Sequence, residues 1–306
     1  YVFTPNLRDA VDREAAAARE LGIRGVFCRG SIDLVEDNDL TPPPMIESEQ
    51  QILDHTEELL KRHHEVGRGA QVQVAVAPCT PVQVTRDLMQ ESAWLGRRFD
   101  APLHTHLAET ADEVAMIERR HNQRSVSYLA DVGWLANDVW VAHGIHFDDR
   151  ELQRLGAAGT GVSHCPSSNA ILASGSCRTP ELEAAGCPVG LGVDGSASND
   201  HSNLMQEVRQ AFLANRLHYG AQTVRHGDAL RWATEGSAAC LGRDDIGRIA
   251  PGMEADLALF RLDEPRFSGY GDPLAALVTC GAHRADRVMV GGQWVVSDGE
   301  LVNADL

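Results

Sequence analysis

The sequence predicts an α/β fold in which parallel strands alternate with helices. Short runs rich in valine and alanine recur along the chain, and segments of helical composition separate them. Strands of this kind, joined by helices, pair in parallel through right-handed crossovers. The 306 residues suffice for one large domain or for a domain with an appendage. Two architectures fit: an open doubly wound sheet, or a (β/α)8 barrel of which six units are visible.

The elements follow one another in a regular order. The first helix pattern, residues 7–22, stops at Gly22, because glycine is favoured just past a helix end. The last long helix pattern, residues 203–217, carries one apolar stripe. The predicted strands are residues 23–30, 72–78, 101–109, 139–145, 159–166 and 188–195. The other predicted helices are residues 46–66, which follow a proline-rich loop at 36–44, and residues 85–98, 111–129, 149–157 and 181–185.

The end of the chain has a different pattern. Residues 246–260 and 286–302 are short β-like runs broken by glycine turns, and no helix is predicted between them. This change divides the chain into an α/β portion over residues 1–243 and a small β portion over residues 244–306.

Charge and cysteine usage exclude several classes of function. The chain has 27 basic and 44 acidic residues, a net charge of −17, which disfavours nucleic acids and anionic membranes as partners. Its seven cysteines contain no C-x-x-C pair, so they indicate reduced thiols rather than disulfides or a thiolate zinc site. No apolar run reaches the ~18–20 residues that span a membrane. We therefore expect a cytoplasmic protein that binds a neutral small molecule.

The stretch LHTHLAET carries the first chemical signal. His104 and His106 lie two residues apart and share one face of a strand, and Glu109 follows just beyond the strand end. Neutral imidazoles are suitable ligands for zinc or iron(II). A glutamate three residues past such a ligand can reach the attacking water and shuttle its proton. His104 itself either touches the substrate or supports the neighbouring ligand.

Two later strands end in residues of matching chemistry. His143 closes the strand at 139–145, and Asp194 follows an apolar run between glycines, where a carboxylate is costly unless it binds something. Taken alone, Asp194 also fits a turn or cap residue. With His106 and His143 in register, the pattern predicts a metal site at the carboxyl ends of the strands. Further candidates are Asn169 and His164 as pocket wall or core, and His201 as a gate.

The motifs LHTHLAET, VAHGIHFDD, SHCPSSN and GLGVDGSASNDHSNLMQEVRQAF, closed by GRIAPGMEADLALF, together resemble the amidohydrolase superfamily. The likeness covers essentially the whole chain and is greatest to the deaminase branch. It implies a (β/α)8 barrel with a composite β-sandwich to which residues 244–306 contribute. It also implies a metal bound by His106 and Asp194, with Glu109, His143 and Asp194 as catalytic residues. Substrate would contact His143 and Glu109, with Asn169 and His201 as further candidates.

The same resemblance implies features that the printed residues do not supply. The superfamily has an H-x-H ligand pair after its first strand, and no H-x-H precedes His104, so we expect about one hundred residues, including two βα units, to be missing. A bridging lysine is absent from the strand at 72–78, and Lys61 is the only lysine, which favours one metal ion. That ion is expected to be Zn²⁺, with Fe²⁺ as the alternative. The resemblance also implies a homo-oligomer, such as a dimer.

The implied reaction is hydrolytic deamination of a purine-type base, with 8-oxoguanine, which would give urate and ammonia, as the first expected substrate. Guanine or isoxanthopterin deamination and hydrolysis of a triazine are the alternatives within the same chemistry. A barrel that binds purines without catalysis is the alternative of another class. Glu109 separates these classes, because a binding protein has no use for a proton shuttle at that position.

Overall fold

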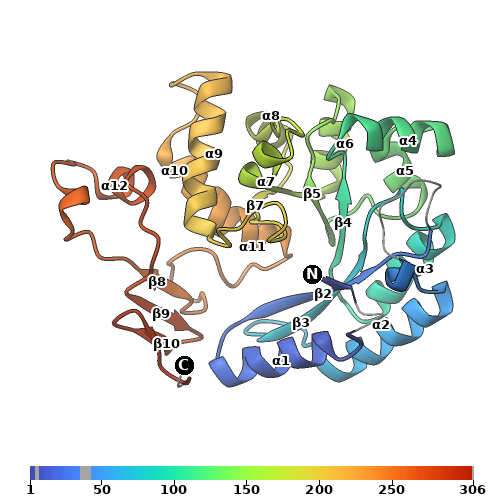
Figure 1. The fold of residues 1–306 in the computed structure, drawn as a ribbon, viewed down its shortest axis with the longest axis horizontal. Helices are drawn as coiled ribbons and strands as arrows, with labels where there is room; N and C mark the ends of the chain where they lie inside the picture. The colour runs from blue at the N-terminus through green and yellow to red at the C-terminus, as the bar shows by residue number, and fades with distance from the viewer. Residues whose placement is uncertain (4–6, 35–42, 305–306) are drawn as a thin grey trace.

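The computed structural model describes residues 1–3, 7–34 and 43–304. Seven parallel strands form one sheet whose order follows the sequence, β1 to β7, so every crossover joins neighbouring strands (Figure 1). The strands are β1 (Val2–Phe3), β2 (Gly25–Ser31), β3 (Val72–Pro78), β4 (Leu103–Leu107), β5 (Val139–His143), β6 (Gly161–His164) and β7 (Val189–Leu191). The predicted alternation of strands and helices is thus confirmed. Residues 36–42 of the predicted proline-rich loop lie outside the described residues.

The structure has one strand more than the sequence predicts. Val2 and Phe3 of β1 pair in parallel with Arg29 and Gly30 of β2. Two residues are too few for alternation or composition to indicate a strand. The six strand–helix units predicted from the sequence are therefore one fewer than the seven parallel strands of the structure. Within the described residues the sheet is open, with β1 and β7 at its two edges.

Helices α1 to α3 pack against β2 and β3, and the later helices follow the remaining strands (Figure 1). Their local signals agree with the sequence: Gly22 ends α1 at φ +76°, and Ser48 and Gln51 form a capping box at the start of α2. The helices of this part are α1 (Ala10–Leu21), α2 (Glu49–His63), α3 (Arg86–Arg98), α4 (Ala111–His121), α5 (Ser125–Asp131), α6 (Asp149–Ala158), α7 (Pro166–Ile171), α8 (Thr179–Ala184), α9 (Leu204–Tyr219), α10 (His226–Arg231) and α11 (Ser237–Cys240). One 3₁₀ turn, Pro43–Met45, precedes α2, and a π-helical turn, Trp232–Gly236, joins α10 to α11.

The helix predicted over residues 111–129 is two helices. α4 ends at Asn122, which has a left-handed backbone with φ +52°, and α5 begins at Ser125. Asparagine tolerates this conformation better than most residues, so it can end a helix as glycine does. The eight residues between Ile117 and Val126 are all polar, so the apolar pattern pauses at the break, a signal that the prediction of one helix passed over.

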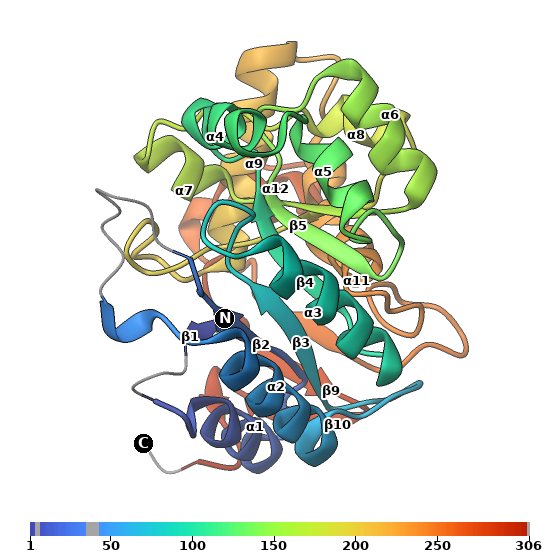
Figure 2. The same ribbon diagram turned by 90° about the vertical axis from the view of Figure 1, so that its right-hand side faces the viewer.

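The C-terminal part contains a four-stranded antiparallel sheet in the order β11-β10-β9-β8. Figure 1 labels β8, β9 and β10, and Figure 2 labels β9 and β10 from the side. Its strands are β8 (Leu257–Leu259), β9 (Arg287–Val290), β10 (Gln293–Ser297) and β11 (Glu300–Leu301). The expectation of no helix in this part was wrong, because a 3₁₀ turn, Pro265–Phe267, and the helix α12 (Pro273–Thr279) lie between β8 and β9. Pro273 occupies the first turn of α12, Asp272 caps it, and the helix packs against α9 and α10.

The main core lies between the parallel sheet and its helices. Val74, Val76, Leu103, Val141 and Val162 are at most 2% exposed and belong to it. Alternate residues of the same strands point to the other face of the sheet. This alternation leaves the opposite face free to carry polar side chains.

Partly buried ion pairs attach the C-terminal sheet to the larger part. The Arg24 guanidinium, just before β2, lies 2.6 Å from Asp256 Oδ2 and 3.3 Å from Glu254 Oε2. Because Arg24 presents several N–H groups to two carboxylates, the contact fixes orientation as well as distance.

Among the described residues, no helix has the length and apolar character required to cross a membrane.

Candidate active site

A cavity of about 580 Å³ lies at the carboxyl ends of the parallel strands, where β3 to β7 pass into their loops. Loops that follow neighbouring parallel strands converge at this edge, which makes it the usual place for a site in such folds. The predicted residues His106, Glu109, His143 and Asp194 all line the cavity. The rest of the wall is formed by Tyr1, Phe3, Cys79, Thr80, Gln83, His104, Trp140, Ala142, Ser163, Cys165, Gly192 and Gly195.

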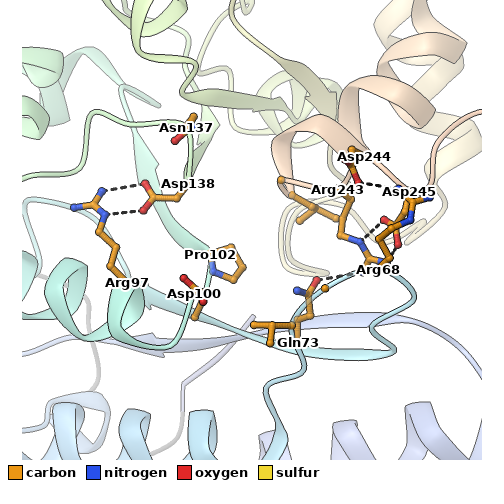
Figure 3. A pocket seen from close by; sticks show the side chains of 15 residues that line it. Arg68, Gln73, Arg97, Asp100, Pro102, Asn137, Asp138, Arg243, Asp244 and Asp245 are labelled. Carbon is orange, nitrogen blue, oxygen red and sulfur yellow. Dashed lines mark hydrogen bonds and ion pairs between the residues drawn. The ribbon is translucent and has the colours of Figure 1, made fainter. Parts of the chain in front are cut away.

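A larger cavity, of about 650 Å³, lies at the opposite ends of the strands (Figure 3). Each arginine that lines it is paired with a carboxylate: Arg97 lies 2.6 Å from Asp138, Arg243 lies 2.7 Å from Asp245, and Arg68 lies 3.5 Å from Asp244. The described residues that line it include no histidine. Size alone would favour this cavity, but chemistry requires groups that are free to act on a ligand. We therefore place the candidate site in the smaller cavity.

His106, at the end of β4, is held in one tautomer by the preceding strand. Its Nδ1–H donates to the Cys79 carbonyl at 2.8 Å, and the same oxygen accepts the His106 backbone amide at 2.9 Å. Nε2 therefore keeps its lone pair. Burial, and next the neighbouring His143, lower the pKa of His106, so its imidazole is neutral at neutral pH.

His143 ends β5 with a left-handed backbone, φ +74°, a conformation that costs on the order of 1–3 kcal/mol in a residue with a Cβ. Its Nδ1–H donates to Asn169 Oδ1 at 3.0 Å. The free Nε2 lies 3.6 Å from Glu109 Oε2 and 3.9 Å from Asp194 Oδ2. Burial lowers the pKa of His143, so this nitrogen is available as an acceptor.

Asp194 follows β7, also with a left-handed backbone, φ +64°. Its Oδ2 accepts the Ser168 hydroxyl at 2.5 Å and the Ser198 hydroxyl at 3.3 Å, and its Oδ1 accepts the Gly195 amide at 2.7 Å. Burial opposes ionisation, but the Ser168 hydrogen bond and His143 outweigh it and lower the pKa of Asp194. The side chain is therefore an anion at neutral pH.

The pKa of Glu109 is shifted in the opposite direction from that of Asp194. Burial raises its pKa, the Asp194 carboxylate raises it further, and His106 opposes the shift. Two carboxylates in one cavity, one with a lowered and one with a raised pKa, form a pair in which one stays ionised while the other exchanges protons.

The geometry fits a single divalent ion. One donor atom each from His106, His143 and Asp194 lie within 4.8 Å of one another, and this is the group of potential ligands found among the described residues. The sequence assigned only His106 and Asp194 to the metal, whereas the structure brings His143 into the same group. Two neutral imidazoles and one carboxylate are a donor set that suits zinc or iron(II).

The remaining predicted residues take different positions. Asn169 is buried and is engaged with the His143 ring rather than exposed to the cavity. His201 is exposed and does not line the cavity. His104 does line it, with Nδ1 3.1 Å from the Trp140 carbonyl and its ring stacked on the indole at 4.5 Å.

Sequence reasoning missed the groups that hold the site residues. The Cys79 carbonyl and the Ser168 hydroxyl left no signal, since a backbone carbonyl and a serine on a short helix occur everywhere. The Tyr1 ring packs edge-on against His106 at 5.1 Å, and its hydroxyl donates to the Ala77 carbonyl at 2.8 Å. Glu113 did leave a signal, because Thr110 and Glu113 match the spacing of a helix capping box.

His164, at the end of β6, predicts how stability depends on pH. It is 1% exposed, neither ring nitrogen has a hydrogen-bond partner among the described residues, and burial lowers its pKa to about 3. A lowered histidine pKa stabilises the fold above the unfolded value of about 6.5, and this contribution is lost as the pH falls below it. Between pH 7 and pH 5 we expect His164 to cost the protein on the order of 2 kcal/mol.

Thermal unfolding of His164→Leu at pH 7 and pH 5 measures this contribution. The variant should lose clearly less stability over that interval than the wild type, and a His218→Leu control, at an exposed position, should behave as the wild type does. Equal losses in the His164→Leu and wild-type proteins would show that His164 does not control the acid sensitivity.

The sequence profile of the amidohydrolase family matches residues 3–295 of the chain. The chain belongs to the amidohydrolase family. The family resemblance of the motifs is therefore confirmed. The family comprises enzymes, and the relatives of this chain include deaminases and hydrolases that act on C–N bonds.

Individual relatives of the chain act on heterocyclic compounds. 8-Oxoguanine deaminase of Pseudomonas aeruginosa is 55% identical over 307 residues, an alignment that covers 100% of this chain and 68% of that protein. Isoxanthopterin deaminase from an unknown prokaryotic organism is 32% identical over 326 residues, with the same coverage of 100% and 68%. The crystal structure of atrazine chlorohydrolase from Arthrobacter aurescens TC1, complexed with zinc, matches with a TM-score of 0.92 and 31% identity, over 97% of this chain and 66% of that one. The chain spans about two thirds of the length of these relatives.

Proposed function

We propose that the protein is a metal-dependent deaminase that converts 8-oxoguanine and water to urate and ammonia. The observation that carries this proposal is the convergence of His106, His143 and Asp194 on one point, with the Glu109 carboxylate 3.6 Å from the His143 ring. The 55% identity to 8-oxoguanine deaminase of Pseudomonas aeruginosa supports this choice of base. Isoxanthopterin, guanine and hydroxytriazines are the alternative substrates. Isoxanthopterin deaminase and hydroxydechloroatrazine ethylaminohydrolase, two relatives of the chain, support the first and the last of these.

His106 and Asp194 would hold the divalent ion, and His143, the third member of the same group, would keep its Nε2 for the water. Zn²⁺ is the proposed identity because a structural relative contains zinc. When bound, such an ion is a Lewis acid that lowers the pKa of water toward 7 and so makes a nucleophile available at neutral pH. The (β/α)8 barrel and the composite β-sandwich are part of the same proposal. They are supported by the parallel seven-stranded sheet and by the small antiparallel sheet.

The residues of the chain have distinct roles in this reaction. Asp194, which is ionised, accepts a proton from the attacking water, while the neutral Nε2 of His143 accepts a hydrogen bond and orients that water. The water oxygen forms a bond to the amino-bearing carbon of the base, C2 in 8-oxoguanine. Glu109 donates its proton to the adjacent ring nitrogen. The ionised Glu109 then takes the hydroxyl proton of the adduct and passes it to the amine. The C=O bond forms as the C–N bond breaks, ammonia leaves, and the proton held by Asp194 returns to Glu109.

The decisive test measures ammonia release by the zinc-loaded protein, expressed from its complete gene, with 8-oxoguanine, guanine, isoxanthopterin and hydroxyatrazine. We expect kcat/KM to be largest for 8-oxoguanine. A larger value for another base would replace the proposed substrate but keep the chemistry. Absence of ammonia with every base would contradict the proposed deaminase function.

A further inference from the structure

Glu109 lies in a turn whose backbone is held on one side by the segment that follows the next strand, β5. Ala108, immediately before it, has φ +53°, in the left-handed region that a residue with a Cβ avoids. Its carbonyl oxygen accepts the backbone amides of Ile145 and His146 at 2.9 and 3.0 Å. The turn is therefore attached to the segment that follows His143, whose imidazole faces the Glu109 carboxylate.

Glu113 holds the same turn from its other side. Its Oε2 accepts the backbone amide of Glu109 at 2.8 Å, and its Oε1 accepts that of Ala108 at 3.2 Å. Both oxygens of one carboxylate are thus used on two consecutive amides. Hydrogen bonds to an ionised acceptor are roughly twice as strong as neutral ones.

This contact differs from ordinary helix capping. Glu113 is the third residue of α4, and its amide donates to the hydroxyl of the N-cap residue Thr110 at 3.1 Å. In a capping box the side chain at this position returns to the amide of the N-cap residue itself. Glu151 does so in α6, where it accepts the Asp148 amide at 3.0 Å. Glu113 instead reaches past Thr110 to the two amides of the preceding turn, so it holds the turn rather than the helix end.

The position of Glu113 is costly. Burial raises the pKa of its carboxyl to about 7, although the backbone amides of Glu109 and Ala108 partly offset the shift. The two amide hydrogen bonds favour the ionised carboxylate in a position that burial disfavours, so the turn and the Glu113 side chain stabilise each other.

We propose that Glu113 is a positioning residue that acts through Glu109, because its two hydrogen bonds orient the turn that presents the Glu109 carboxylate to the reacting base. This inference rests on the proposed deaminase function. Glu113 itself touches neither the cavity nor the candidate metal ligands. Its removal should therefore impair proton transfer and leave metal and substrate binding intact.

The Glu113→Gln variant tests this in the protein expressed from its complete gene and loaded with zinc. A glutamine side chain keeps the shape but offers one acceptor oxygen instead of two. We expect kcat to fall about 10- to 100-fold, since small displacements of a catalytic group have effects of this size. KM and zinc content should stay within about twofold of the wild type.

A double variant separates positioning from general damage. If Glu113 acts through Glu109, then Glu113→Gln should cause no further loss of kcat when Glu109→Gln is already present. A full additional loss in that background would overturn the proposal, and so would a wild-type kcat in the single variant. The matched control is Glu151→Gln, because Glu151 also accepts two backbone amides, those of Asp148 and Val126, and lines no part of the cavity. Its kcat should not change.

Hydrogen exchange gives a readout that does not depend on activity. The amides of Ala108 and Glu109 should exchange faster in Glu113→Gln than in the wild type, and at the wild-type rate in Glu151→Gln. If the wild type releases no ammonia, the proposed function fails, and this measurement still decides whether Glu113 holds the turn. Unchanged exchange at both amides would overturn that conclusion.

Discussion

Glu109→Gln is expected to reduce kcat by about 10²- to 10⁴-fold while the protein binds zinc and substrate as the wild type does. Glutamine has nearly the same shape but cannot donate and accept a proton in turn. Burial raises the pKa of Glu109, which favours the protonated form that can donate to the base. Its carboxylate lies 3.6 Å from His143 Nε2, within the cavity where the base would bind.

Single-turnover and steady-state measurements of urate formation would show whether the loss lies in the chemical step. The control is Glu118→Gln, the same chemical change on the exposed side of α4, where Glu118 pairs with Arg124 at 3.1 Å. That variant should keep wild-type kinetics. A Glu109→Gln protein with unimpaired kcat would refute the assignment of Glu109 as the proton shuttle, even if the substrate proved correct.

The predicted site residues came together because strand ends are readable in a sequence. In a parallel sheet the carboxyl ends of successive strands lie side by side, so His106 of β4 and His143 of β5 become neighbours once their strands are recognised. Alternation along β4 then places His104 and His106 on one face. Asp194 stood out because a carboxylate follows the apolar run of β7.

The supporting contacts could not be predicted in the same way. Asn169 and Ser168 lie on α7, a helix of six residues, and their contacts with His143 and Asp194 join positions 26 residues apart. Only the packing of α7 against its neighbours brings them into reach. The break between α4 and α5 was missed for a different reason, since the polar stretch between Ile117 and Val126, which contains the left-handed Asn122, was included in one predicted helix. Local patterns predict elements and strand ends, whereas contacts between elements depend on tertiary packing.

Asp194→Asn should affect the protein more severely, because it removes the only anionic member of the metal-binding group. In the proposed site the carboxylate would supply negative charge to the ion, and it also accepts the Ser168 and Ser198 hydroxyls and the Gly195 amide. An asparagine amide has one acceptor oxygen, so its nitrogen must face a donor or the metal. Loss of a group that only supports a metal ligand typically costs about 10- to 100-fold in affinity. We expect the loss of this ligand to exceed about 100-fold, with kcat at or below that of Glu109→Gln.

Competition with a zinc chelator measures the affinity, and circular dichroism verifies that the variant is folded. Ser168→Ala is the graded comparison, since it keeps the carboxylate but removes its 2.5 Å hydrogen bond. Its zinc affinity should fall by only about tenfold, at the lower limit for a supporting group. A zinc affinity that falls from wild type to Ser168→Ala and further to Asp194→Asn would show that the charge on Asp194 binds the ion and that Ser168 orients the Asp194 carboxylate. If Asp194→Asn retained zinc as tightly as Ser168→Ala, the ion would have to be held by other groups. The role of Asp194 would then be limited to accepting the proton of the attacking water.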